Sequence, residues 1–438
     1  MSDLGVTIPS GFDAQRPKPT SVPMRFLPQM SLVERDQRWR ALREAMDKAG
    51  IAAAIFVGSD YSFHAGLANI RYIFQAASEI ASVALFFGSG LPVVWNDPPH
   101  MNRPYNFLHS TQNWVTDIRP YGGMAVVAAE LWDRGFDRSR IGLVSASSGL
   151  FPSSILAHEE RALRKALPNV DFVDLNPLME VMRLVKSKEE ISMLRQAGRI
   201  ARKVLDAAVS VATPGTTEAE LYAEMERAKI IGGGEPDGFN LLSSGPVEHP
   251  AEENWHLLHG LDRPLVPSQR KLANGDIVIS EWHTRFGGYN VHSEYTIYVG
   301  KTPPAELAKI FAVCVECLDA AKDVLRPGTT MREAWQAISA PAARADLAWV
   351  EVGLHGHGLT SPEFPAAIRE EHLADLGPLG QMTGDVVLAE GMCFGTGFDL
   401  HNPRWKADVG CILGETFVVR PGGGEALVDV PRTIGTAG

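Results

Sequence analysis

The spacing of apolar and polar positions predicts alternating helices and strands along the first part of the chain. Residues 31–50 carry apolar side chains at helical spacing, between a serine that suits a helix N-cap and a glycine that suits its end. The runs 51–59 and 81–97 are apolar and rich in β-branched and aromatic residues, and a Gly-Ser-Gly turn divides the second into two strands. Residues 140–167 continue with a strand and a helix. This alternation is typical of an α/β domain.

An internal repeat organises the rest of the chain. Residues 205–217 and 318–330 share Leu-Asp-Ala-Ala, five further residues and Pro-Gly-Thr-Thr. Each copy predicts the end of one helix, a Pro-Gly stop and a Thr N-cap for the next helix. A duplication predicts two related α+β halves with a site at their junction. We therefore expect an N-terminal arm at 1–30, an α/β domain at 31–180 and a catalytic domain at 181–438.

Composition narrows the class of protein. The chain has 438 residues, of which 45% are hydrophobic and 21% charged, which is typical of a globular protein. Lys and Arg total 41 against 52 Asp and Glu, a net charge of −11 that argues against a nucleic-acid partner. No apolar run is long enough for a membrane helix and no secretory leader is visible, so we expect a cytoplasmic location. The four cysteines are too few for a disulfide framework, and the CxxC pair among them suits core packing better than zinc: Cys314, Cys317, Cys393 and Cys411.

Polar residues interrupt a strand pair predicted at 275–300. Side chains alternate between the two faces of a strand, so Glu281 and His283 share a face with the apolar residues before them. In the return strand, His292 and Glu294 share a face in the same way. Such residues are also common on a water-exposed hairpin. Because the strand begins as a buried run, we favour a functional cluster of two Glu and two His.

Three later segments carry further candidate residues. The Gly-rich stretch 351–365 places His355 and His357 two residues apart, as neighbours on one strand face. The stretch 384–402 is a strand that begins at a tight Glu-Gly-Met turn. In the stretch 410–423, Glu415 interrupts an apolar strand.

These motifs together resemble the pita-bread family, which includes creatinase, prolidase, aminopeptidase P and methionine aminopeptidase. The resemblance rests on GD-IVI-x-E followed by Gly-Tyr, then HGHG-x4-E-x-P, EGM-x-F and GET-x-VV, in this order over about residues 185–425. The segment RLVKSKEEISMLRQA is similar to the domain junction of that family. The resemblance implies an α+β pita-bread catalytic domain with pseudo-twofold duplicated halves, preceded by an α/β creatinase-like N-terminal domain.

The resemblance also implies a metal site, but with altered ligands. Peptidases of this family bind two metal ions with Asp, Asp, His, Glu and Glu. These positions fall on Glu281, His292, His355, Gly397 and Glu415, so one ligand is absent and two are changed. Because bridged pairs of hard ions need carboxylates, this pattern argues against a dinuclear peptidase. The four remaining residues could hold one divalent ion (Zn, Fe, Ni or Mn), and a metal-free site as in creatinase stays open.

Further roles follow from the same resemblance. Glu294 occupies the position of the glutamate that binds guanidinium in creatinase. The acid/base histidine of the family lies in a segment like 243–260, which offers His256 or His259, with His249 as a third choice. Glu363 matches a family glutamate and is a candidate for acid/base or supporting work, whereas a family histidine that peptidases use is replaced by Pro362. Candidate substrate contacts are Trp95, which could reach the site of a partner subunit, His283 and His357.

The expected activity is hydrolysis of a C–N bond in an amidine, urea or amide of a small polar molecule. We expect a homodimer with no nucleic-acid or membrane partner. Three alternatives stay open: a metal-dependent lyase of the dimethylsulfoniopropionate lyase type, an Xaa-Pro aminopeptidase-like metallopeptidase, and a non-catalytic binding protein on the same scaffold. LLSSGPVEHP and VVWND loosely resemble segments of those lyases.

Overall fold

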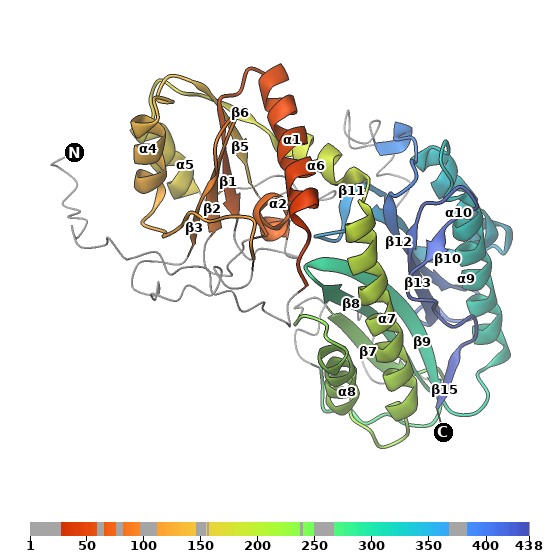
Figure 1. Cartoon of the computed structure of the whole chain (residues 1–438). Helices are drawn as coiled ribbons and strands as arrows, with labels where there is room; N and C mark the ends of the chain where they lie inside the picture. The colour runs from red at the N-terminus through yellow and green to blue at the C-terminus, as the bar shows by residue number, and fades with distance from the viewer. Residues whose placement is uncertain are drawn as a thin grey trace. The chain divides into compact units, whose positions relative to one another are not determined.

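The computed structural model describes residues 28–58, 65–75, 82–96, 112–145, 155, 157–236, 240–248, 267–367 and 383–437 (Figure 1). The chain divides into two compact units with the main boundary between Leu175 and Asn176. Most of the predicted N-terminal arm lies outside the described residues, so the arm and the expected domain limits stay predictions. Within the described part, no helix has the length and apolar character needed to cross a membrane.

The N-terminal unit is built on a mixed six-stranded sheet in the order β4-β3-β2-β1-β5-β6. As predicted, the first helix starts behind Ser31, whose hydroxyl accepts a hydrogen bond from the backbone N–H of Glu34. The strands are β1 (Ala53–Gly58), β2 (Ser82–Phe87), β3 (Val93–Asn96), β4 (Ile118–Pro120), β5 (Arg140–Val144) and β6 (Asp171–Asp174). The helices are α1 (Leu32–Lys48), α2 (Ala65–Phe74), α4 (Met124–Asp133) and α5 (Ala157–Ala166).

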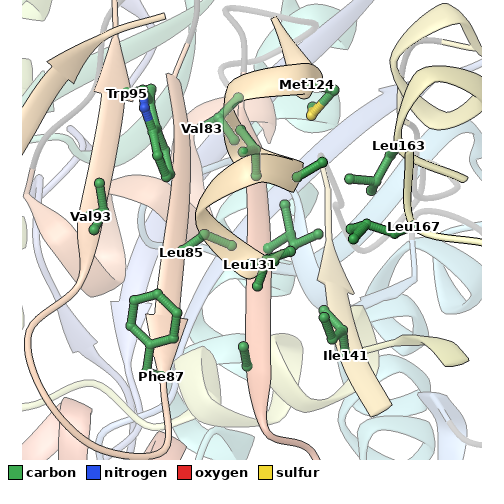
Figure 2. Packing of buried hydrophobic residues seen from close by; sticks show 14 residues of the cluster. Val83, Leu85, Phe87, Val93, Trp95, Met124, Leu131, Ile141, Leu163 and Leu167 are labelled. Atoms are coloured by element: carbon green, nitrogen blue, oxygen red, sulfur yellow. The ribbon is translucent and has the colours of Figure 1, made fainter. Parts of the chain in front are cut away.

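Trp95 lies inside the core of this unit, which corrects its predicted role. Figure 2 shows its side chain on β3, in the same apolar cluster as Val83, Leu85 and Leu131. Only 2% of Trp95 is exposed. A side chain enclosed by its own core presents no surface to a substrate, so we do not keep Trp95 among the substrate contacts.

The C-terminal unit is built on a nine-stranded sheet. Its main path runs β11-β10-β12-β13-β9-β8-β7, with β14 added to β13 and β15 to β9. The strands are β7 (Asn240–Pro246), β8 (Asp276–Phe286), β9 (Tyr289–Val299), β10 (Ala348–Gly356), β11 (Glu363–Ala367), β12 (Cys393–His401), β13 (Gly410–Val418), β14 (Glu425–Ala426) and β15 (Gly435–Ala437). The helices are α6 (Asn176–Leu184), α7 (Lys188–Val211), α8 (Glu218–Ile231), α9 (Ala305–Val324) and α10 (Met331–Arg344).

The two copies of the repeat form equivalent helix pairs. In each copy a long helix, α7 or α9, ends shortly before the Pro-Gly-Thr-Thr turn, and a second helix, α8 or α10, begins directly after it. Thr217 and Thr330 both form capping boxes, in which the Thr side chain and a Glu three residues later exchange hydrogen bonds with backbone N–H groups. Helix α7 packs on β8 and β9, and α9 packs on β12 and β13 (Figure 1). The structure confirms the helix–turn–helix copies predicted from the repeat.

The helices lie against one face of the large sheet. Tyr222 of α8 packs on Trp282 of β8 at 4.9 Å between ring centroids, and Phe311 of α9 packs on Tyr295 of β9 at 6.3 Å. Because successive side chains of a strand point to opposite faces, the residues flanking Trp282 and Tyr295 point away from these helices. The polar residues predicted from the sequence are therefore on the face opposite the helices: Glu281, His283 and Glu294, with His292 two residues before Glu294.

Candidate active site

The β8–β9 hairpin pairs the predicted polar residues directly. In its register Glu281 lies opposite Glu294, and His283 lies opposite His292. Residues opposite each other on neighbouring strands point to the same face, so this pairing confirms the convergence expected from the alternation. Strand β10 brings His355 to the same face. Its ring centroid lies 5.1 Å from that of His292.

Three imidazoles form the centre of the site, and we call them the imidazole cluster: His292, His355 and His357. One ring nitrogen from each lies within 4.8 Å of the others. All three side chains are buried. Gly395 of β12 makes room for them, because a Cβ at that position would lie 2.6 Å from Nδ1 of His292. A larger residue there would push the rings apart.

Hydrogen bonds to backbone carbonyls set the tautomers of two of these rings. Nε2 of His292 lies 3.1 Å from the carbonyl oxygen of Thr396, and Nδ1 of His357 lies 3.4 Å from the carbonyl oxygen of Asn290. A carbonyl oxygen only accepts, so these two contacts favour the tautomers that carry the ring hydrogen on Nε2 of His292 and on Nδ1 of His357. In these tautomers Nδ1 of His292 and Nε2 of His357 both present lone pairs; the two atoms lie 2.8 Å apart, and the hydroxyl of Ser361 lies 3.0 Å from Nε2 of His357.

This arrangement fits a metal site. In the tautomers that bond the two carbonyls, both nitrogens offer lone pairs on the same side, and metal-binding histidines commonly donate their other N–H to a backbone carbonyl in this way. Nδ1 of His355 is buried and has no hydrogen-bond partner among the residues that the structure describes. The imidazole cluster can thus supply three nitrogen ligands to one divalent ion, a set that suits Zn, Fe or Ni.

Burial keeps these rings neutral. It lowers the pKa of His292 to about 4 and the pKa of His355 to about 3. It also lowers the pKa of His357 well below its usual value, and the neighbouring imidazoles add to this effect. Neutral imidazole is the form that binds a metal ion, so the cluster is ready to do so at pH 7.

Glu281 and His283 form a second, hydrogen-bonded pair beside the cluster. Nε2 of His283 lies 2.8 Å from Oε1 of Glu281, and the side-chain amide of Asn290 donates to Nδ1 of His283 at 2.9 Å. Burial raises the pKa of Glu281, but the hydrogen bond from His283 and the nearby imidazoles outweigh it and leave this pKa below its usual value. Both ring nitrogens of His283 are engaged, so His283 holds Glu281 in position, and its predicted contact with a substrate stays a prediction.

Two site-facing positions that could carry carboxylates are glycines, and Glu294 fills the space above them. A Cβ on Gly397 would lie 2.5 Å from Oε1 of Glu294, and a Cβ on Gly414 would lie 2.7 Å from its Cδ. Burial, followed by the negative charge of Glu281, raises the pKa of Glu294 well above its usual value. Without carboxylates at positions 397 and 414, these two strands do not complete the ligand set of a bridged pair of metal ions.

Glu415 is not part of this site, which corrects the prediction that it binds metal. In the register of β13 it is Gly414 that lies opposite Glu294, so Glu415 points to the helix-covered face. There its carboxylate accepts hydrogen bonds from the backbone N–H groups of Thr416, Val428 and Val430, at 2.9, 2.9 and 3.0 Å. Matching the motif positions by their spacing put the last metal ligand on Glu415, one residue after Gly414, which faces the site.

Glu363 is held by cations, which favours the supporting role over the acid/base role among the two predicted for it. Its carboxylate lies 2.7 Å from Nζ of Lys186 and 3.7 Å from Nε of Arg183, and all three side chains are buried. Burial raises the pKa of Glu363, but these two cations outweigh it and lower the pKa below its usual value. The backbone N–H of Leu359 donates to it at 3.0 Å. Glu363 therefore anchors the loop after His357 and is a poor proton donor.

Four further predicted residues remain untested. His256 and His259, with the third choice His249, lie outside the described residues. His357 was predicted as a substrate contact, which stays a prediction; its place in the imidazole cluster also makes it a candidate metal ligand. The spacing of two residues from His355 could have indicated this, because both side chains then share one strand face.

The sequence of the chain is similar to those of known metallopeptidases and of a hydrolase. The model of metallopeptidase family M24 matches residues 192–421. The chain is 29% identical to the probable dipeptidase PepE of Mycobacterium tuberculosis over 275 residues, 61% of this chain and 67% of that protein. It is 26% identical to the ectoine hydrolase of Halomonas elongata over 347 residues, 78% of this chain and 80% of that protein.

Solved structures confirm the predicted pita-bread fold. The dipeptidase PepE of Mycobacterium ulcerans superposes with a TM-score of 0.70 at 22% identity, covering 94% of this chain and all (100%) of that one. The X-Pro aminopeptidase of Thermotoga maritima superposes with a TM-score of 0.72 at 18% identity, covering 91% of this chain and 99% of that one. At such identities the likeness concerns the fold alone.

Proposed function

The chain belongs to metallopeptidase family M24, and we propose that within this family of hydrolases it cleaves a C–N bond of a small non-peptide molecule. The bond would belong to an amidine, a urea or an amide. One observation carries the proposal: the positions of β12 and β13 next to Glu294 are Gly397 and Gly414, and the side chain of Glu294 occupies the space above both. The site thereby differs from one built around two carboxylate-bridged ions.

A single divalent ion fits the nitrogen donors present. His292, His355 and His357 would hold it, with Zn, Fe, Ni and Mn as candidates. When bound, such an ion polarises a C=O or C=N group and lowers the pKa of a bound water. A metal-free site remains the second possibility, and elemental analysis of the purified chain decides between them.

The other residues of the site have separate tasks in this proposal. Glu281, oriented by His283, presents an ionised oxygen beside the imidazole cluster, where it can add a ligand or accept the proton of an attacking water. Glu294 orients the polar end of the substrate, because its carboxylate lies beside the imidazole cluster, with Oε1 at 3.7 Å from Nε2 of His292. His256 or His259 remains our candidate for moving a proton to the leaving nitrogen.

A substrate panel tests the proposal. Amidine, guanidino, ureido and amide compounds, including ectoine, are incubated with the metal-loaded chain, and release of the cleaved product is measured. A Pro-containing dipeptide with Mn²⁺ serves as the competing substrate, because dipeptidases are among the similar proteins. Turnover of the dipeptide without turnover of any other compound would refute the proposal. Size-exclusion chromatography with light scattering tests the homodimer that we also propose.

A further inference from the structure

Asn290 of β9 connects the hydrogen-bonded pair of Glu281 and His283 with the imidazole cluster. Its side-chain amide donates to Nδ1 of His283 at 2.9 Å, and its backbone carbonyl oxygen lies 3.4 Å from Nδ1 of His357. Its backbone N–H donates at 2.7 Å to the carbonyl oxygen of Gly358, the residue after His357. Only 1% of Asn290 is exposed. One buried residue thus holds two imidazoles, the first through its side chain and the second through its backbone.

The hydrogen bond from Asn290 determines which nitrogen of His283 carries the ring hydrogen. An amide N–H only donates, so Nδ1 of His283 accepts and the hydrogen of the neutral ring lies on Nε2. Nε2 lies 2.8 Å from Oε1 of Glu281 and donates to it. If the oxygen of the amide faced the ring instead, Nδ1 would carry the hydrogen, and Nε2 of a neutral ring would direct a lone pair at the carboxylate. The orientation of Asn290 in the structure therefore satisfies both contacts of a neutral His283.

The oxygen of the same amide indicates what the asparagine is for. Oδ1 of Asn290 is buried and has no hydrogen-bond partner within the described part of the chain. A buried acceptor without a partner is unfavourable, and an apolar side chain at this position would avoid it. The presence of an asparagine is therefore better explained by the N–H that it donates to His283 than by packing.

The hydrogen on Nε2 of His283 matters for Glu281 in two ways. It gives the carboxylate a fixed partner at 2.8 Å, which holds its orientation beside the imidazole cluster. It also donates to the carboxylate, and such a bond favours the ionised form that accepts protons. A side chain that removes or reverses the hydrogen bond from Asn290 would disturb both, although it does not touch Glu281.

We propose that Asn290 is a positioning residue for the reaction: its side-chain N–H keeps the ring hydrogen of His283 on Nε2, where it orients Glu281. This inference rests on the proposed function, in which Glu281 accepts the proton of an attacking water. The side chain of Asn290 serves Glu281, whereas its backbone carbonyl serves His357. Because a substitution changes only the side chain, it should impair the base and leave the metal ligands in place.

Asn290→Asp tests the inference, because a carboxylate has nearly the shape of the amide but only accepts hydrogen bonds. Nitrogen NMR of the full chain, labelled with ¹⁵N-histidine and loaded with Zn²⁺, shows which ring nitrogens carry hydrogen. The signals of His283 are assigned by their loss in His283→Gln. We expect hydrogen on Nε2 alone in wild type, and on Nδ1 in Asn290→Asp.

Turnover and metal content are measured on the same variant. With a compound of the substrate panel that wild type cleaves, kcat of Asn290→Asp should fall at least about 10-fold at nearly unchanged KM, since general-base catalysis contributes roughly 10²–10⁴-fold. The amount of bound metal should stay at the wild-type level. Asn240→Asp is the matched control: Oδ1 of this buried residue accepts from the backbone N–H of His283 at 2.9 Å, which an aspartate can still do. In this control the ring hydrogen of His283 should stay on Nε2.

Each outcome decides the inference. Hydrogen on Nδ1 of His283 in wild type overturns it, and so does wild-type kcat or loss of metal in Asn290→Asp. If Asn290→Asp does not fold, Asn290→Ala, which removes the donor, takes its place with the same expected fall in kcat and the same retention of metal. If wild type cleaves no compound of the panel, the proposed function fails, whereas the nitrogen spectra still decide whether Asn290 sets the hydrogen of His283.

Discussion

Glu415→Gln tests whether this carboxylate stabilises the fold or binds metal. Its two oxygens accept three backbone N–H groups, from Thr416 and Val428 on Oε1 and from Val430 on Oε2. A glutamine has one acceptor oxygen, so its amide nitrogen must face at least one of these N–H groups. Leaving one buried donor without an acceptor costs about 1–3 kcal/mol. For a domain of this size that lowers the melting temperature by roughly 2–10 °C.

The pH dependence sharpens this prediction. Burial raises the pKa of Glu415 to about 7, although the backbone N–H groups oppose the rise. Because folding raises the pKa of Glu415, its protonated form stabilises the folded state, and this contribution is complete below pH 4.5, the pKa in the unfolded chain. The contribution is lost as the pH rises to about 7, the pKa in the folded chain. The difference corresponds to about 3 kcal/mol. The advantage of wild type over Glu415→Gln should therefore shrink by about that amount between pH 4.5 and pH 8.

Urea unfolding at several pH values measures both effects, because other titrating groups cancel in the difference between wild type and variant. Metal content is measured on the same samples by elemental analysis. We expect Glu415→Gln to bind as much metal as wild type, whereas His355→Ala should lose it. A Glu415→Gln variant that loses metal and keeps wild-type stability at every pH would refute our placement of Glu415.

Three further predictions test the rest of the site. His357→Ala should lower the bound metal from about one ion per chain to nearly none, as measured by elemental analysis, and full retention would contradict its ligand role. Gly397→Ala places a methyl group against Glu294, so we expect a loss of about 1–3 kcal/mol in unfolding free energy and reduced turnover at unchanged metal content. Glu363→Gln leaves the buried charge of Lys186 without its partner, and we expect denaturant unfolding to show a loss of about 3–5 kcal/mol; a change below 1 kcal/mol would argue against a buried ion pair.

The sequence alone indicated the features that depend on neighbouring residues. The alternation along 275–300 put Glu281 with His283, and His292 with Glu294, on shared strand faces, because side-chain direction in a strand has a period of two. The repeat indicated two capped helices, because a capping box involves residues only three apart. These expectations needed no knowledge of distant contacts, and the structure agrees with them.

The tertiary structure decided which of the candidate residues meet. A shift of one residue along a strand moves the side chain to the other face of the sheet. The motif match therefore could not show whether Glu415 or Gly414 faces the site until the pairing of the strands and the position of the helices were known. Glu363 pairs with Lys186, which lies 177 residues away and carries no local mark of that contact. The lone pairs of the imidazole cluster depend on carbonyl groups of two other strands. Local pattern thus determined the direction of each side chain within its strand, whereas the packing of distant strands and helices determined its partners and hence its chemistry.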